Sequence, residues 1–342
     1  MDDERLFSPL DLTLARRPRS TWRVEASYAI TDFEGRPHLV VTSPAAAPSR
    51  EYAPLAHHEL PAEFARLATG EPDAVLHFAH EYGQLGYQAS NDDVGFEHMA
   101  VLLGRQSAEE IRSHSPGRWG DPVPWIVAHA RAVSLVGDLA AALDDRVRLK
   151  ATLDRLTVRT SDEETLMTFS CPMPTSIQPA PGCLPLAETP RRSAQDVIAT
   201  LLNANIGGVD RHIVRGDQPE LTSSFSLHNL LGAVWWLLAD SVTAGTVQTC
   251  RACGQFFVAQ HGHERFCPRP MGEEGKSKCM MRFKQQRYRD RAKQGMREAP
   301  SVPSPSPETP RVARPKERRL PKTTEEPTRM ASRTRPTQRR RR

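Results

Sequence analysis

The pattern of apolar and polar positions predicts three long helices that each bury one face. Between residues 125 and 143 apolar side chains recur every three or four positions, and a further helical piece follows as far as Leu156. The same spacing occurs over residues 193–206 and, most strongly, over residues 227–242. The residues expected to cap these helices at their N-termini are Asp121, Ser193 and Ser226.

Strand-forming residues bounded by turn residues predict small β-hairpins. The first joins residues 22–30 to residues 38–42 through a turn at 32–37 that contains Gly and Pro. A second hairpin is expected to pair residues 211–215 with residues 221–225. Short helices are expected at 61–69, 73–82 and 107–113.

Together these elements predict an α+β fold. Its N-terminal body is mainly helical with small β-hairpins, and a C-terminal zinc-ribbon-like module with a basic helix follows. Prolines are too dense over residues 171–190 for regular structure to be expected there. The expected division is a mixed helical and hairpin region at 1–170, a Pro-rich loop or linker at 171–192, a helical lead-in packed on the body at 193–246, a four-cysteine zinc finger with a basic helix at 247–297, and a disordered basic, Pro-rich tail at 298–342.

Four of the six cysteines fall in one C-terminal window, with a spacing typical of a zinc site. Cys250 and Cys253 enclose two residues, so both thiolates can reach one ion, and Cys267 and Cys279 follow after gaps of 13 and 11 residues. Four thiolates make a closed tetrahedral site, and we therefore expect one structural Zn²⁺. Gly254 suits a knuckle in which backbone N–H groups point at sulfur.

The same stretch allows two other interpretations of the metal site. His261 or His263 could replace a cysteine as ligand, and Glu264 could serve as the general base of a catalytic zinc. Four sulfurs already complete the coordination of zinc, whereas a catalytic ion needs an open position. We therefore expect a structural site, with both histidines exposed in a loop.

Directly after the last cysteine the chain becomes strongly basic. From Lys276 to Arg297 there are nine Lys and Arg against one acid, Asp290, in a segment rich in helix formers. Such a helix, held by a metal, can contact phosphates and reach base edges. The alternative is a solvated basic helix without a ligand. The expected nucleic-acid contacts are Arg282, Lys284, Arg287, Arg289 and Arg291.

The composition separates a basic tail from the rest of the chain. The 342 residues include 29 prolines and are 38% hydrophobic, and residues 299–342 carry 13 Lys and Arg against 4 Asp and Glu. Such a tail buries too little apolar surface to offset its ordering entropy. We find no apolar run of membrane-spanning length and no signal peptide, and we expect a cytoplasmic protein without a membrane partner. Reduced thiols there favour metal binding over disulfides.

Several short motifs around the cysteines are similar to those of a known family. They are Cys250-Arg-Ala-Cys-Gly-Gln-Phe-Phe257, Arg265-Phe-Cys267, Cys279 with Arg282, and Arg287-Tyr-Arg-Asp-Arg291. The stretch resembles the CGNR-type zinc-finger proteins of bacteria, which are described as transcription regulators with an ABATE-like N-terminal region. The resemblance implies that the four cysteines bind zinc and that the module contacts DNA.

The leading hypothesis is a zinc-finger, DNA-binding transcription regulator whose N-terminal region senses a ligand or mediates self-association. The alternative is a zinc-stabilised module that binds RNA or an acidic protein without reading a DNA sequence. No catalytic motif is found, so an enzyme is not expected. Two further groups invite a metal but lack enough ligands, and the sequence leaves the oligomeric state open. These groups are Cys171 with Cys183, and His77 and His80 with Glu81.

Overall fold

A computed structural model describes most of the chain before the tail. The described residues are 20–33, 35–43, 47–87, 120–159, 165–174, 176–215, 221–268 and 277–297. By internal contacts the chain divides into two compact units, residues 1–292 and residues 293–342. The helix expected at 107–113 and the tail expected at 298–342 lie outside the described residues. Within those residues the fold is mixed α and β, with seven α-helices and five small antiparallel sheets.

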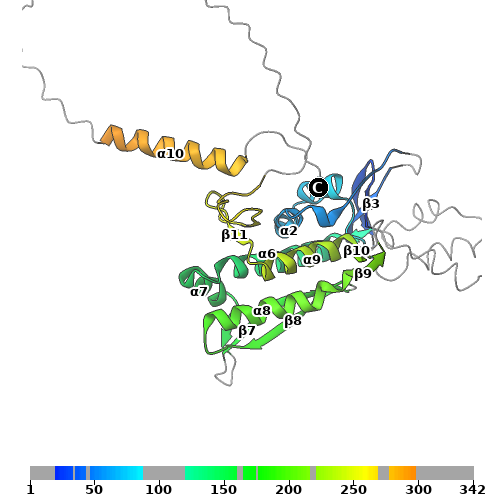
Figure 1. Ribbon diagram of the computed structural model, residues 1–342, viewed down its shortest axis with the longest axis horizontal. Helices are drawn as coiled ribbons and strands as arrows, with labels where there is room; N and C mark the ends of the chain where they lie inside the picture. Colours follow the sequence, from blue (N-terminus) through cyan, green and yellow to red (C-terminus); the bar gives the residue numbers. More distant parts are fainter. Residues whose placement is uncertain are drawn as a thin grey trace, which may run out of the picture. The chain divides into compact units, whose positions relative to one another are not determined.

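One long helix, α6 (Val123–Ala142), forms the centre of the core (Figure 1). Apolar residues surround it on nearly all sides, and Trp125 and Ile126 are each only 1% exposed. Two further helices, α8 (Pro190–Asn205) and α9 (Leu230–Thr243), pack against it. Each helix turns an apolar stripe toward this core, which is why the apolar spacing predicted all three helices correctly.

The helix α6 is also long and apolar enough, by length and composition, to cross a membrane. It is the one helix of the described ranges with this property, and 67% of its most apolar 18-residue stretch is buried inside the protein. Buried core helices of water-soluble proteins share this property. The sequence-based expectation that no apolar run reaches this length is therefore corrected.

The expected N-terminal hairpin is confirmed, but its first strand is broken in two. β2 (Tyr28–Phe33) and β3 (Arg36–Val41) pair antiparallel around Gly35, whose φ of +74° favours glycine. β1 (Trp22–Val24) separates from β2 and pairs instead with β4 (Arg50–Tyr52). Strand propensity predicts one continuous strand over 22–30 because it carries no information about this distant partner.

Both short helices expected after the first hairpin are confirmed. A 3₁₀ turn, η1 (Pro54–Ala56), precedes α2 (Leu60–Ala65), which continues into η2 (Arg66–Thr69). Gly70 ends this segment with a φ of +76°, a conformation that a Cβ would disfavour. α3 (Pro72–Tyr82) then begins on a proline, whose missing N–H costs nothing in the first turn of a helix.

The Pro-rich stretch at 171–192 is largely regular structure, contrary to the expectation of a loop or linker. β7 (Thr165–Met173) and β8 (Ser176–Pro185) form an antiparallel hairpin, and β6 (Thr157–Arg159) pairs with the start of β7. Because β8 lies at the edge of the sheet, its prolines do not remove ladder hydrogen bonds from a second neighbour. The hairpin packs on α8 and α6 and fully buries Met167.

The second expected hairpin is confirmed, with strands longer than expected. A turn, η4 (Ile206–Gly208), leads from α8 into β9 (Val209–Arg215), which pairs antiparallel with β10 (Leu221–Leu227). The backbone of Gly208 touches the first turn of α9 at Gly232, where a Cβ would lie 2.4 Å from the Cα of Gly208. Only glycine fits at this close approach of two backbones.

Asp121 was expected to cap α6, but it does not do so. It lies in the two-residue strand β5 (Asp121–Pro122), which pairs with β3, and it is only 3% exposed. Its carboxylate accepts hydrogen bonds from the N–H groups of Leu85, Gly86 and Tyr87. Burial raises the pKa of this carboxyl to about 6, although the three donors act in the opposite direction. The carboxylate thus accepts hydrogen bonds from backbone N–H groups of a distant loop and not from those of the adjacent helix.

The other two expected caps are also displaced. Ser193 lies inside α8, whose N-cap is Thr189, and Ser226 belongs to β10. Asn229 caps α9, because its side-chain oxygen accepts the N–H of Gly232 at 2.6 Å. Each of these helices offers more than one residue with a capping side chain, and the path of the preceding strand decides which one is used.

The cysteine-rich segment packs directly on the helical core. Strands β11 (Val247–Thr249) and β12 (Phe256–Val258) form an antiparallel hairpin after α9. Phe256 and Val247 belong to the main hydrophobic core. The ring of Phe256 lies so close to α6 that a Cβ on Gly137 would be 2.3 Å from it. Residues 247–292 therefore belong to the same compact unit as the N-terminal region.

Candidate metal centre

The four C-terminal cysteines converge at one point. The Sγ atoms of Cys250, Cys253, Cys267 and Cys279 all lie within 4.8 Å of one another. A tetrahedral ion bound to sulfur at about 2.3 Å holds its ligands about 3.8 Å apart, so only a small contraction is needed. The cluster can hold one metal ion, and the expected ligand set is brought together in full.

The first two ligands lie in a tight knuckle after β11. The N–H of Cys250 donates to the carbonyl of Gln255 at 2.8 Å, and that of Gly254 donates to the carbonyl of Cys250 at 3.0 Å. Gly254 has a φ of +75°, which favours glycine. The N–H groups of Ala252 and Cys267 point at Sγ of Cys250, each 3.4 Å away. The expected donation of N–H groups to sulfur is confirmed.

The electrostatics of the cluster suit a cation. Burial opposes ionisation of Cys250, but the backbone N–H groups around it lower the pKa of its thiol to about 7. Burial and the neighbouring sulfurs raise the pKa of the Cys267 thiol well above its usual range, and they raise that of Cys279 to about 11. Crowded thiols resist losing four protons unless a cation compensates the charge, so metal binding and deprotonation are coupled.

The histidine and glutamate alternatives find no support in the geometry. His261 and His263 stack on each other with ring centroids 5.6 Å apart, and neither belongs to the ligand cluster. A carboxylate oxygen of Glu264 accepts the N–H of Gln260 at 2.7 Å, which closes the loop between them. Thiolates are soft donors that suit Zn²⁺ and other thiophilic ions.

The last ligand ties a helix to the knuckle. α10 (Lys278–Arg297) carries Cys279 in its first turn. Ser277 precedes it, donates from its hydroxyl to the carbonyl of Cys267 at 2.6 Å, and accepts the N–H of Met280 at 3.4 Å. On the next turn, the ring of Phe283 packs against Phe266 with centroids 5.2 Å apart. Metal ligand, cap and aromatic contact therefore fix the start of α10 against the knuckle.

An arginine that the sequence analysis did not single out joins the knuckle to the body. Arg148, on α7 (Arg146–Asp154), donates to Asp138 of α6 at 3.2 Å and to the carbonyl of Gly254 at 3.1 Å. A further guanidinium N–H donates to the hydroxyl of Thr249. Burial raises the pKa of Asp138, while Arg148 opposes that shift. Nothing in the local sequence marks this residue, because its three partners come from distant segments.

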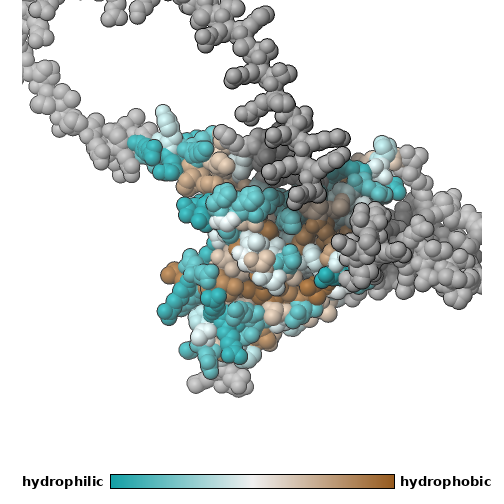
Figure 2. All heavy atoms as spheres, in the orientation of Figure 1, coloured by the Kyte–Doolittle hydropathy of each residue, from teal (hydrophilic) through white to brown (hydrophobic). Residues whose placement is uncertain are grey.

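The basic side chains of α10 as far as Arg291 are solvent-exposed. Arg282, Lys284, Arg287, Arg289 and Arg291 make no ion pair within the described part of the chain. The single acid of the helix, Asp290, accepts a hydrogen bond from Gln286 at 3.0 Å. On the face drawn in Figure 2 mostly hydrophilic residues cover this helix. The helix thus presents net positive charge to the solvent.

The two minor metal hypotheses gain nothing from the structure. Cys171 and Cys183 are free thiols that lie opposite other residues on β7 and β8. His80 packs its ring edge-on against Tyr28, with centroids 5.4 Å apart. Among the described residues, the C-terminal cysteines form the one cluster able to hold a metal ion.

The cysteine cluster and the exposed basic helix are therefore the two features that bear on function. No family model, curated protein or solved structure matches the chain. The functional argument rests on these two features and on their connection through Cys279.

Proposed function

We propose that this chain is a zinc-folded, DNA-binding transcription regulator, in keeping with its resemblance to CGNR-type zinc-finger proteins. One Zn²⁺ is the proposed occupant of the four-cysteine cluster. In this proposal the metal performs no chemistry and instead supplies folding energy to a segment with a very small core of its own. The N-terminal body is proposed to sense a ligand or to mediate self-association.

The observation that carries the proposal is the position of the fourth ligand. Cys279 lies in the first turn of α10, so a bound metal orients the helix that bears the exposed cations. DNA is a dense array of phosphates, and each Lys or Arg that neutralises one releases a condensed counterion. A rigidly mounted basic helix gains this energy without first paying for its own ordering, which a flexible basic tail must do.

Within this proposal the cations of α10 fall into two groups. The guanidinium of Arg287 lies over the ring of Phe283, 5.9 Å from its centroid, so its direction is fixed by the protein. A pre-oriented arginine suits bidentate contact with a guanine edge. Arg289 and Arg291 are exposed without such support and suit phosphate contacts, which position a protein on the duplex.

A second candidate function is favoured by two exposed apolar side chains on the same helix. Tyr288 is 77% exposed and Met281 is 42% exposed, and their spacing of seven residues places them along one stripe of α10. Such a stripe beside basic residues suits an acidic protein surface, or a single-stranded RNA whose bases stack on Tyr288. In this alternative the metal site is the same, but the module does not recognise a DNA sequence.

The test compares two double variants that remove equal charge. Arg287→Ala/Arg289→Ala removes two cations from α10, whereas Arg159→Ala/Arg192→Ala removes two exposed cations from the body. We expect the first to weaken binding to duplex DNA and to reduce the slope of log affinity against log salt by about 1, because only Arg289 of the two is assigned to a phosphate. The second should leave both unchanged, and elemental analysis should find the same metal content in both proteins.

Two results would speak against the DNA proposal. Equal affinity of wild type and the α10 variant would remove that helix from the interface. Tight binding to single-stranded RNA, with no preference among DNA duplexes at fixed salt, would favour the second candidate.

A further inference from the structure

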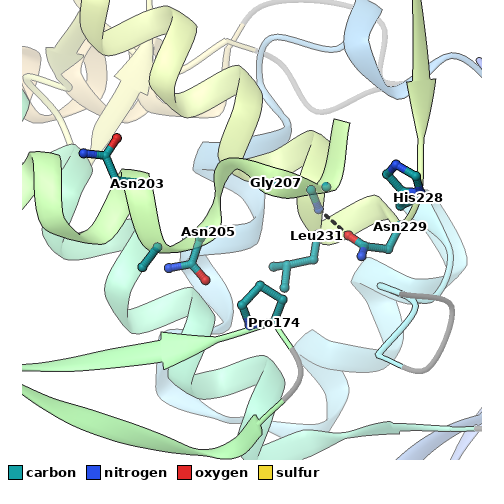
Figure 3. A pocket seen from close by; sticks show the side chains of 10 residues that line it. Pro174, Asn203, Asn205, Gly207, His228, Asn229 and Leu231 are labelled. Atoms are coloured by element: carbon teal, nitrogen blue, oxygen red, sulfur yellow. Dashed lines mark hydrogen bonds between the residues drawn. The ribbon is translucent and has the colours of Figure 1, made fainter. Parts of the chain in front are cut away.

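A cavity lies away from the metal centre, between the end of α8 and the start of α9. Its volume is about 410 Å³. The wall comes from the η4 turn, from the first residues of α9 and from Pro174 after β7. Figure 3 shows Asn205 and Leu231 on opposite sides of Pro174. A water molecule fills about 30 Å³, so this space is far larger than one water and falls in the range of small-molecule sites.

One buried polar atom beside the cavity lacks a partner. Asn205 is only 1% exposed, and its side-chain N–H₂ donates to the carbonyl of Leu201 at 2.9 Å. The other amide atom, Oδ1, has no hydrogen-bond partner among the residues that the structure describes. The orientation of the amide is settled by Leu201, because a swapped amide would set two oxygens against each other.

The direction of this oxygen connects it to the cavity. In Figure 3 the Oδ1 atom of Asn205 is on the side of the amide that faces Pro174 and Leu231. A buried acceptor without a donor costs folding free energy, and most such atoms in proteins are satisfied. The unmet requirement here is for an N–H or O–H donor that approaches from the cavity.

The other residues of the wall indicate what kind of molecule could carry such a donor. Pro174 and Leu231 are apolar, and the glycines of the η4 turn expose flat backbone. The other polar side chains of the wall are the amides of Asn203 and Asn229 and the imidazole of His228, whose Nε2 lies 2.7 Å from a carboxylate oxygen of Asp210. No Lys or Arg lines the cavity within the described chain, so an anionic ligand would find no counter-charge.

We propose that this cavity binds a small, uncharged, planar amide or aryl amine that donates an N–H to Oδ1 of Asn205. Its ring lies against Pro174 and Leu231, and its outer edge is within reach of His228. Oδ1 is itself buried, so the wall has to open locally for the donor to reach it. This site shares no residue with the metal centre or α10, so it stands apart from the nucleic-acid proposal.

Three closely related probes test the chemistry on the unmodified full-length chain. Nicotinamide is neutral and carries the donor, methyl nicotinate is neutral without it, and nicotinate is an anion. Saturation-transfer NMR gives the affinity of each in the millimolar range. We expect nicotinamide to bind at least about tenfold more tightly than the ester, the effect of one hydrogen bond to a buried acceptor, and nicotinate to bind most weakly.

Two variants then locate the site. Asn205→Ala removes the acceptor and should abolish the preference for amide over ester, whereas Asn203→Ala, an exposed residue of the same cavity, should retain it. The probe comparison on the wild type stands even where Asn205→Ala fails to fold. The proposal is overturned by equal affinity for amide and ester, or by no saturation transfer to nicotinamide, which would mean that water alone satisfies Asn205.

Discussion

The indole N–H of Trp235 on α9 donates a hydrogen bond to Nδ1 of His129 on α6, 3.2 Å away. An indole nitrogen only donates, so Nδ1 must be the acceptor and Nε2 must carry the imidazole proton. That proton points at the carbonyl of Met173, also at 3.2 Å, and this carbonyl additionally accepts the indole N–H of Trp125. Through these bonds the neutral His129 joins α6, α9 and the β7–β8 hairpin.

His129 should make stability depend on pH. Burial lowers the pKa of this imidazole to about 3 from its usual 6.5, although the Met173 carbonyl acts in the opposite direction. Between these values the unfolded chain binds the proton and the folded chain does not. Stability from this residue is therefore complete above pH 6.5 and is lost as the pH falls towards 3, by about 2 kcal/mol at pH 5.

The measurement is urea unfolding at pH 8 and pH 5, on wild type and on His129→Gln. The variant keeps polar atoms at this position but cannot be protonated, so its stability should fall less between the two pH values. The same fall in both proteins would show that His129 does not titrate on unfolding.

Metal content should depend on the four clustered thiols alone. Cys250→Ser should lower the metal from one ion per chain to a small fraction, because Sγ of Cys250 is a proposed ligand and also accepts two knuckle N–H groups. Cys183→Ser changes an exposed free thiol on β8 and serves as the control. Elemental analysis after gel filtration checks both. Full metal content in Cys250→Ser would contradict the assigned ligand set.

The contact between α6 and β12 should be intolerant of a single methyl group. Gly137→Ala would set its Cβ 2.3 Å from the ring of Phe256, and such overpacking costs about 1–3 kcal/mol. Gly262→Ala provides the control, because a Cβ there meets no atom within 4 Å. Urea unfolding measures the difference. Phe256→Leu in the Gly137→Ala background should recover part of the loss, and a harmless Gly137→Ala would refute this packing.

Loss of Arg148, which joins the body to the knuckle, should lower the free energy of unfolding because it leaves the partly buried Asp138 without its partner. Arg148→Ala leaves Asp138 without its partner and frees the carbonyl of Gly254, so we expect a loss of about 1–3 kcal/mol. Adding Asp138→Asn removes the unpaired charge and should return part of that stability. A double-mutant cycle by chemical unfolding gives the coupling. Additive effects of the two substitutions would mean that the ion pair contributes nothing.

Local patterns predicted the parts of the fold that depend on local physics. The burial of one helix face determines where α6, α8 and α9 occur. The spacing of Cys250, Cys253, Cys267 and Cys279 identified, before any geometry was known, the residues that form a cluster able to hold a metal ion. Metal binding constrains the residue types so strongly that the cysteine spacing can be recognised in a single sequence.

The parts that were misjudged depend on partners far away in the chain. The prolines of β8 indicated a loop, yet they are tolerated because that strand lies at a sheet edge. Asp121 was expected to cap a helix, but its carboxylate satisfies the N–H groups at 85–87. Capping propensity and proline content describe a residue's own backbone, and they do not report which strand or loop packs beside it.

The sequence by itself determined the helical core, the four cysteines that can hold a metal ion and the basic character of the helix that follows them. The tertiary structure decided how the knuckle docks through Arg148 and Phe256 and how His129 is protonated. It also left an oxygen of Asn205, beside a cavity, unpaired among the residues that the structure describes. The physical reason is the distance along the chain over which each kind of interaction acts. Periodicity and ligand spacing act over a few residues, whereas desolvation and hydrogen-bond pairing depend on every segment that folding brings to the same place.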